Sequence, residues 1–227
     1  MSENFVEIKD GLKDSERSEL TKQLAEKLQE LNNQTNATPL ARARIQLDVA
    51  EILVALERKS EAWILAREAF AIVLAHDAWT DAVEACDVLY QCGQPESVAA
   101  LGMGVWLSVS FPVNPELTLA LLLHIVDETP SNSDGAAIAA VVARYVIDLR
   151  ADDEKYESLS FLANNLIGQV AERHSNVRDQ AALDSWMDKL ELRDPQIFLP
   201  RLGLVVNTIV GDTWWFDRDE LRNKFAD

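Results

Sequence analysis

Glycine and proline are scarce in this chain of 227 residues, which holds 8 of the first and 7 of the second. All-β folds made of many short strands need more of both, because their tight turns depend on them. Alanine, leucine and glutamate are abundant instead, and these residues favour helices. With 48% hydrophobic residues the chain can form a sizeable core. The composition therefore predicts an all-α fold.

Cysteine is also rare, and Cys86 and Cys92 are the two that the chain has. Their spacing fits neither a disulfide framework nor a zinc site, so we expect two half-buried thiols in a reducing compartment. The N-terminal residues lack the apolar run of a signal peptide. The weakly charged stretch Val98–Val126 is interrupted by Pro112 and Pro115, which leaves no uninterrupted membrane span. These absences predict a cytoplasmic protein without a membrane segment.

Basic residues are few, with 21 Lys and Arg against 38 Asp and Glu, and the formal net charge is −17. Such a charge repels phosphate backbones, so we expect no direct nucleic-acid binding. It favours a basic protein or peptide as partner. A short basic stretch contains Arg42 and Arg44, for which a solvated helix face is the preferred interpretation.

Helix-start signals divide the chain at regular intervals. A capping residue followed by proline marks a helix start, because proline has no N–H to leave unpaired there. This pair occurs at Thr38-Pro39, Asn114-Pro115 and Asp194-Pro195, with a weaker version at Gln94-Pro95. The sequence offers further candidate caps at Ser60, Asp77, Ser133 and Asp153.

Every second start falls at 38, 77, 114 and 153, which gives spacings of 39, 37 and 39 residues. Such a period is typical of helical solenoids. We expect about nine or ten helices, arranged as stacked antiparallel hairpins in a right-handed solenoid. The first helices of the hairpins, from about 38, 77 and 114, would line a concave binding face.

The stretch Val49–Ala69 resembles a tetratricopeptide-type hairpin, with Ala50 at the small position of its first helix. A second copy runs over Ala85–Val105, with Gly102 at a close-packing position. The resemblance covers roughly residues 38–110, and HEAT-type packing is the alternative. It implies a stacked-helix scaffold that binds proteins or peptides and has no catalytic residues.

Three regions are expected along the chain. Residues 1–37 form an N-terminal amphipathic helix and a polar linker, and that helix either docks on the array or stays mobile. Residues 38–175 form the hairpin array, and 176–227 a divergent helical cap. Within the cap, residues 202–210 are rich in β-branched side chains; we expect a buried helix there, with a strand as the alternative.

Motifs for catalysis, cofactors or metals are missing. The histidines, His76, His124 and His174, lie far apart, and none has the preceding glutamate of a Glu-x-x-His pair. The acidic run at 152–154 is expected to cap a helix. No phosphate-binding loop or nucleophile motif occurs. We therefore expect no enzyme activity, no cofactor and no metal, with a helical enzyme that lacks a recognisable motif as an alternative.

Two adjacent tryptophans, Trp214 and Trp215, lie near the C-terminus. Asp217 is expected to cap a short final helix, and Phe216 to pack on Leu221 as a hydrophobic staple. Consecutive side chains on an extended link diverge, so burying both indoles on one face is difficult. One interpretation is a terminal cap on the protein's own body. The other is that at least one indole serves a partner or a homodimer, since tryptophan is enriched in interfaces.

The sequence as a whole predicts a non-catalytic interaction scaffold for a protein or peptide partner. The residues expected at the partner interface are Trp214, Trp215, Trp79, Arg42 and Arg44. An acidic decoy that occupies a nucleic-acid-binding protein is an alternative from a different functional class.

Overall fold

The computed structural model describes residues 13–33 and 37–224, and within them all regular structure is α-helical. The all-α prediction is confirmed, although eleven helices are described where nine or ten were expected. The count is higher because the C-terminal part is divided into three separate helices. The helices are α1 Asp14–Asn33, α2 Pro39–Ala55, α3 Lys59–Ala75, α4 Trp79–Gln91, α5 Ser97–Ser110, α6 Pro115–Glu128, α7 Asp134–Arg150, α8 Asp153–Ser175, α9 Gln180–Lys189, α10 Pro195–Val210 and α11 Arg218–Asn223.

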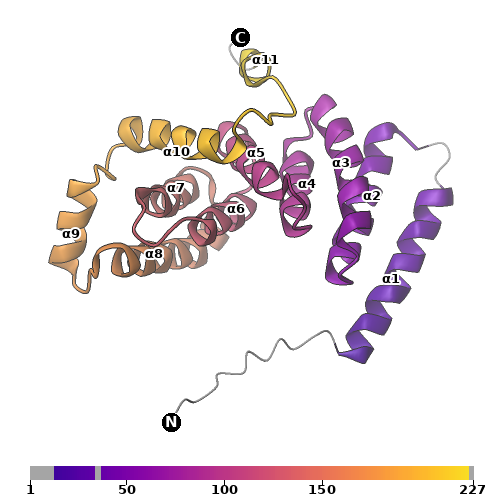
Figure 1. Cartoon of the computed structure of the whole chain (residues 1–227), viewed down its shortest axis with the longest axis horizontal. Coiled ribbons are helices and arrows are strands. Elements are labelled where there is room, and N and C mark those ends of the chain that lie inside the picture. The colour runs from indigo at the N-terminus through magenta and orange to yellow at the C-terminus, as the bar shows by residue number, and fades with distance from the viewer. Residues whose placement is uncertain (1–12, 34–36, 225–227) are drawn as a thin grey trace.

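The helices follow one another in a row from α1 to α9, and α10 then returns over the row (Figure 1). From α1 to α9 each helix packs on the next along the chain. A second set of contacts joins alternate helices, α2 with α4, α4 with α6 and α6 with α8. On the other side α10 packs on α5 and α7. The even-numbered helices α2 to α8 thus form one layer. On the opposite side, α10 covers the odd-numbered helices α5 and α7.

Five predicted caps lie at their expected helix starts. In each, the side-chain oxygen accepts a hydrogen bond from a backbone N–H that has no partner within the helix. Asn114 accepts from Leu117 N at 2.8 Å, for example. The other four are Thr38, Ser133, Asp194 and Asp217.

Four predicted caps were wrong. Gln94 lies three residues before α5, whose cap position is Glu96. Ser60 is the second residue of α3, whose cap position is Arg58, and Asp153 lies inside α8, which Asp152 caps. Asp77 adopts a φ of 54°, and α4 begins two residues later. A left-handed residue at the end of one helix moves the start of the next, and a list of capping residues cannot show this.

Gly102 and Arg150 hold α5 against its neighbours. A Cβ built at Gly102 would lie 2.6 Å from Val210 Cγ2, so the predicted close approach is confirmed, but its partner is α10. The Arg150 guanidinium donates to Ser108 O at 2.6 Å and Val109 O at 2.8 Å, two carbonyls at the C-terminal end of α5. Both contacts fix α5 between α10 and the end of α7.

The predictions at the two ends of the chain are also resolved. Residues 202–210 are helical, and α10 buries Leu202, Val206 and Val210 while Leu204 stays exposed. The helix α1 packs on α2, so it is docked on the array. Residues 1–12 and the linker residues 34–36 lie outside the described residues. None of the described helices has the length and apolar character needed to cross a membrane.

Candidate functional site

Carboxylates gather on the side of α2, α4 and α6 where these alternate helices touch. We name this surface the acidic face. The charges on this face interact between helices. Glu84 and Asp87 of α4 repel the Glu51 carboxylate of α2, and Asp87 lies beside His124 of α6. The acidic face comprises Asp48, Glu51, Asp81, Glu84, Asp87, Asp127 and Glu128.

Part of this negative charge has partners within the chain. Arg44 Nε donates to Asp81 at 2.8 Å, and the Tyr90 hydroxyl donates to Glu128 at 2.8 Å. Asp48 pairs with Lys27 of α1 at 2.7 Å. Two of these pairs join the alternate helices α2 with α4 and α4 with α6, and the third joins α1 to α2.

Glu51 and Glu84 differ from these pairs. Neither makes a hydrogen bond or ion pair within 4 Å among the residues that the structure describes. Burial is the main reason why the pKa of each is raised, and neighbouring carboxylates raise it further. The field of Arg44 offsets this only in part at Glu84. Glu84 is half-buried and Glu51 lies at the exposed edge of the face, and neither has a hydrogen-bonded counter-charge.

Asp87 lies between these two carboxylates and His124. His124 Nε2 is 3.4 Å from Asp87 Oδ1, close enough for charge attraction. The contact raises the pKa of His124, although burial opposes it. The buried Oδ1 atom nonetheless lacks a hydrogen bond in well-formed geometry. It keeps a lone pair for a donor.

A groove between α2 and α4 brings Glu51 and Asp87 together, while Glu84 and His124 lie outside its lining. Its lining mixes the acidic rim of Glu51 and Asp87 with the apolar side chains of Val54, Ala55 and Val88, and it has a volume of about 280 Å³. A lysine or arginine side chain has a matching character, since its aliphatic stem packs on apolar surface while its charged head stays polar. The groove can therefore accept a basic side chain.

The predicted tryptophans lie on the other side of α4, in an aromatic cluster around the C-terminal segment. Trp79 is 9% exposed and stacks on Phe111 at 4.0 Å. Trp214 and Trp215 are both partly buried, against Trp106 and against α3 respectively. The cluster comprises Trp63, Phe70, Trp79, Trp106, Phe111, Trp214, Trp215 and Phe216.

Phe216 packs beyond its own helix start. Its ring lies 5.6 Å from that of Trp106 and 6.2 Å from that of Phe70, so it joins the C-terminal segment to α5 and α3. Leu221 is buried, as expected for the hydrophobic side of a short final helix. The staple interpretation of Phe216 was therefore incomplete.

Of the predicted interface residues, the structure brings together the three tryptophans but not the two arginines. Arg42 donates to Leu31 O at 3.0 Å at the end of α1, and Arg44 binds Asp81. The partner role of all five stays a prediction.

Sequence reasoning missed the residues of the acidic face, although a signal was present. Arg44 and Asp81 are 37 positions apart, and Tyr90 and Glu128 are 38 apart. These separations match the spacing of the helix starts. Polar residues separated by the interval between alternate helix starts were therefore candidates for contact between alternate helices.

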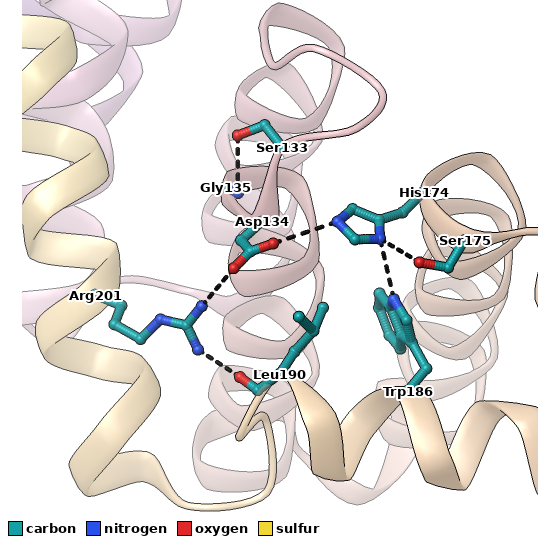
Figure 2. A network of polar contacts seen from close by, with 8 residues as sticks. All are labelled: Ser133, Asp134, Gly135, His174, Ser175, Trp186, Leu190 and Arg201. Atoms are coloured by element: carbon teal, nitrogen blue, oxygen red, sulfur yellow. Dashed lines mark hydrogen bonds and ion pairs between the residues drawn. The ribbon is translucent and has the colours of Figure 1, made fainter.

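A second polar network joins α7, α8, α9 and α10 (Figure 2). His174 Nε2 lies 3.3 Å from Asp134 Oδ1, while its Nδ1 lies 2.6 Å from Ser175 Oγ and 3.2 Å from Trp186 Nε1. Arg201 holds the second oxygen of Asp134 at 3.0 Å.

An acid, a histidine and a serine are also the groups of a nucleophilic triad. Here, however, the Trp186 N–H can only donate, so it occupies the single lone pair of His174 Nδ1. That lone pair would have to take the serine proton. The network therefore positions four helices, and Trp186 is buried at its centre.

The described residues hold no cluster of three or more His, Cys, Asp or Glu side chains arranged for a metal ion. Cys86 and Cys92 are unbridged, and both are fully buried where half-burial was expected. Burial raises the pKa of both thiols, that of Cys92 to about 11.

Comparisons with protein-family models, with curated proteins and with solved structures found no match. The function of the acidic face therefore has to follow from its own side chains.

Proposed function

We propose that the chain is a non-catalytic interaction module that binds a basic segment of a protein partner across the acidic face. The observation that carries the proposal is a set of carboxylates without hydrogen-bonded counter-charges: exposed Glu51, half-buried Glu84, and the Oδ1 atom of Asp87. Carboxylates without counter-charges disfavour folding, since burial acts against their charged form. A lysine or arginine from a partner would supply the missing charge.

The arrangement of the helices supports a repeat scaffold for this face. Alternate helices α2, α4, α6 and α8 touch in sequence, and polar contacts recur at separations of 37 and 38 residues. Both features are expected of a solenoid of stacked hairpins, which we propose as the architecture. The two unbridged thiols agree with a reducing, cytoplasmic location.

The groove favours a partner segment that contains both basic and apolar residues. Val54, Ala55 and Val88 offer apolar contact, while Glu51 and Asp87 accept charge-assisted hydrogen bonds. An acidic or purely apolar segment would satisfy only half of this lining. We therefore assign charge complementarity to recognition and apolar contact to affinity.

The test uses two fluorescein-labelled peptides of equal length, one alternating lysine with leucine and the other glutamate with leucine. Fluorescence anisotropy with the full chain should show binding of the lysine peptide only, and the affinity should fall as salt rises. Substituting Glu51→Gln and Glu84→Gln together should weaken binding by roughly tenfold per carboxylate, because each charge-assisted hydrogen bond contributes about 1.5 kcal/mol.

The matched control substitutes two exposed carboxylates of α8, Glu157→Gln and Glu172→Gln, which gives the same change in net charge. This variant should bind the lysine peptide within about twofold of the unaltered chain, because neither residue lies on the acidic face or lines the groove. An equal loss in both variants would show that binding follows net charge alone. That result, or no binding of the lysine peptide by the unaltered chain, would refute the proposal.

A further inference from the structure

The C-terminal segment, residues 212–224, lies against helices that precede it by more than a hundred positions. It leaves α10 and returns toward α3, α4 and α5 (Figure 1). The Trp215 ring contacts Phe70 of α3 at 5.4 Å, and its N–H donates to Glu96 at 3.0 Å. At the far end, Lys224 Nζ lies 2.6 Å from Asp77 Oδ1.

Side chains alone make the contacts between this segment and α3, α4 and α5. Among the described residues, its backbone hydrogen bonds run within the segment or to the adjacent end of α10. Arg67 of α3 lies 3.9 Å above the Trp215 ring and holds it by a cation–π contact, while Arg218 lies 4.1 Å above the Trp214 ring within the segment itself. Because no backbone pairing would have to break, the segment can leave its groove as one unit.

The connection to α10 is short and solvent-exposed. It consists of Gly211, Asp212 and Thr213. Gly211 has φ 58° and ψ −131°, a combination that residues with a side chain rarely adopt. A different conformation at this residue would direct the segment away from its own body while leaving α10 in place on α5 and α7.

The docked segment leaves space around it. A pocket of about 280 Å³ lies between α3 and the segment, lined among others by Arg67, Phe70, Trp215 and Leu221. The groove on α3 to α5 is thus complementary in aromatic and charged chemistry to residues 212–224 without enclosing them fully. The same contacts are available to an identical segment from another molecule.

We propose that the groove on α3 to α5 is a peptide-docking site whose second occupant is the C-terminal segment of another copy of this chain. Reciprocal exchange of residues 212–224 then produces a homodimer. Exchange is a common route to dimers when a terminal element is connected through a short hinge, because it recreates the contacts of the monomer. Dilution favours docking within one chain, and high concentration favours exchange.

Cross-linking of full-length variants that each gain one cysteine tests this proposal. Lys224→Cys places a thiol on the segment, and His76→Cys places one on the body beside Asp77. The native thiols of Cys86 and Cys92 are buried and should stay silent toward a short bis-maleimide reagent. The double variant should give an internally linked monomer, which verifies that the two positions are within reach.

An equimolar mixture of the two single variants should give a cross-linked heterodimer whose yield rises with protein concentration. Lys224→Cys mixed with Asn164→Cys, an exposed position on α8, measures collisional cross-linking. A heterodimer yield no greater than this control at every concentration overturns the proposal.

Adding Gly211→Ala to both single variants provides a second measurement. A side chain strains the turn of the docked monomer, so the heterodimer yield should increase. An unchanged or reduced yield with this substitution would also contradict exchange through this hinge.

Discussion

Gly102 offers a sharp test of the packing that positions the C-terminal segment. A Cβ at this residue would lie 2.6 Å from Val210 Cγ2 and 3.1 Å from Ile209 Cγ2. Both neighbours are β-branched side chains of α10, which cannot withdraw as the end of a long flexible side chain can. Gly102→Ala therefore forces α10 away from α5 by a few tenths of an ångström.

Two opposing terms set the magnitude. Overpacking a core contact costs about 1–3 kcal/mol. Replacing a helical glycine by alanine raises the free energy of unfolding by about 1 kcal/mol, since alanine restricts the unfolded chain more. The net change in the free energy of unfolding should therefore lie between zero and a loss of about 2 kcal/mol.

Gly168→Ala is the matched control. Gly168 lies within α8, and a Cβ there would meet nothing within 4 Å. The same substitution should raise the free energy of unfolding by about 0.5–1 kcal/mol, because alanine favours the helical conformation and its Cβ meets no neighbouring atom. The difference between the two variants isolates the cost of the contact with α10.

Thermal unfolding followed by circular dichroism measures this difference. For a chain of this size, 1 kcal/mol corresponds to roughly 2–4 °C in melting temperature. Gly102→Ala should melt several degrees below Gly168→Ala, and amide exchange over residues 212–224 should accelerate only in the former. An equal rise in melting temperature for both variants would refute the close approach of α5 and α10.

Three further outcomes follow from the buried polar groups. Because folding raises the pKa of Glu84, the ionised carboxylate lowers the stability of the chain once the pH rises through that pKa. Glu84→Gln should therefore raise the melting temperature at pH 7.5 and have little effect near pH 4. Cys86 and Cys92 should react with a disulfide-exchange reagent at pH 8 only after denaturation, as thiol titration would show. Trp186→Phe should lower stability in urea unfolding by about 1–3 kcal/mol, because it leaves His174 Nδ1 without the indole donor.

The helix starts were predictable because their signals are local. Thr38, Asn114 and Asp194 each precede a proline and cap the backbone amides within three positions. The return of α10 onto α5 and α7 was not predictable in this way. Gly102 indicated a close approach, but a glycine does not identify the helix that approaches it.

The acidic face was harder to predict than the tryptophan pair. With 38 Asp and Glu residues in the chain, no single carboxylate stands out by type, whereas adjacent tryptophans do. What distinguishes Glu51 and Glu84 is a position among other carboxylates without a hydrogen-bonded partner, which depends on the packing of α2 on α4. The repeat spacing indicated which positions meet but gave no information on which of them would lack a counter-charge.

The helix α4 separates two surfaces with opposite energetics. Toward α5 and the C-terminal segment, Trp79 stacks on Phe111 and receives the Lys224 ammonium at 5.9 Å, so aromatic faces and charges satisfy one another. Toward α2 and α6, Asp87 retains an unsatisfied buried oxygen beside the carboxylates of Glu84 and its neighbours. The first surface stabilises the chain without any other molecule. The second leaves Glu51 and Glu84 without hydrogen-bonded counter-charges, and for this reason we propose that a basic partner binds the acidic face.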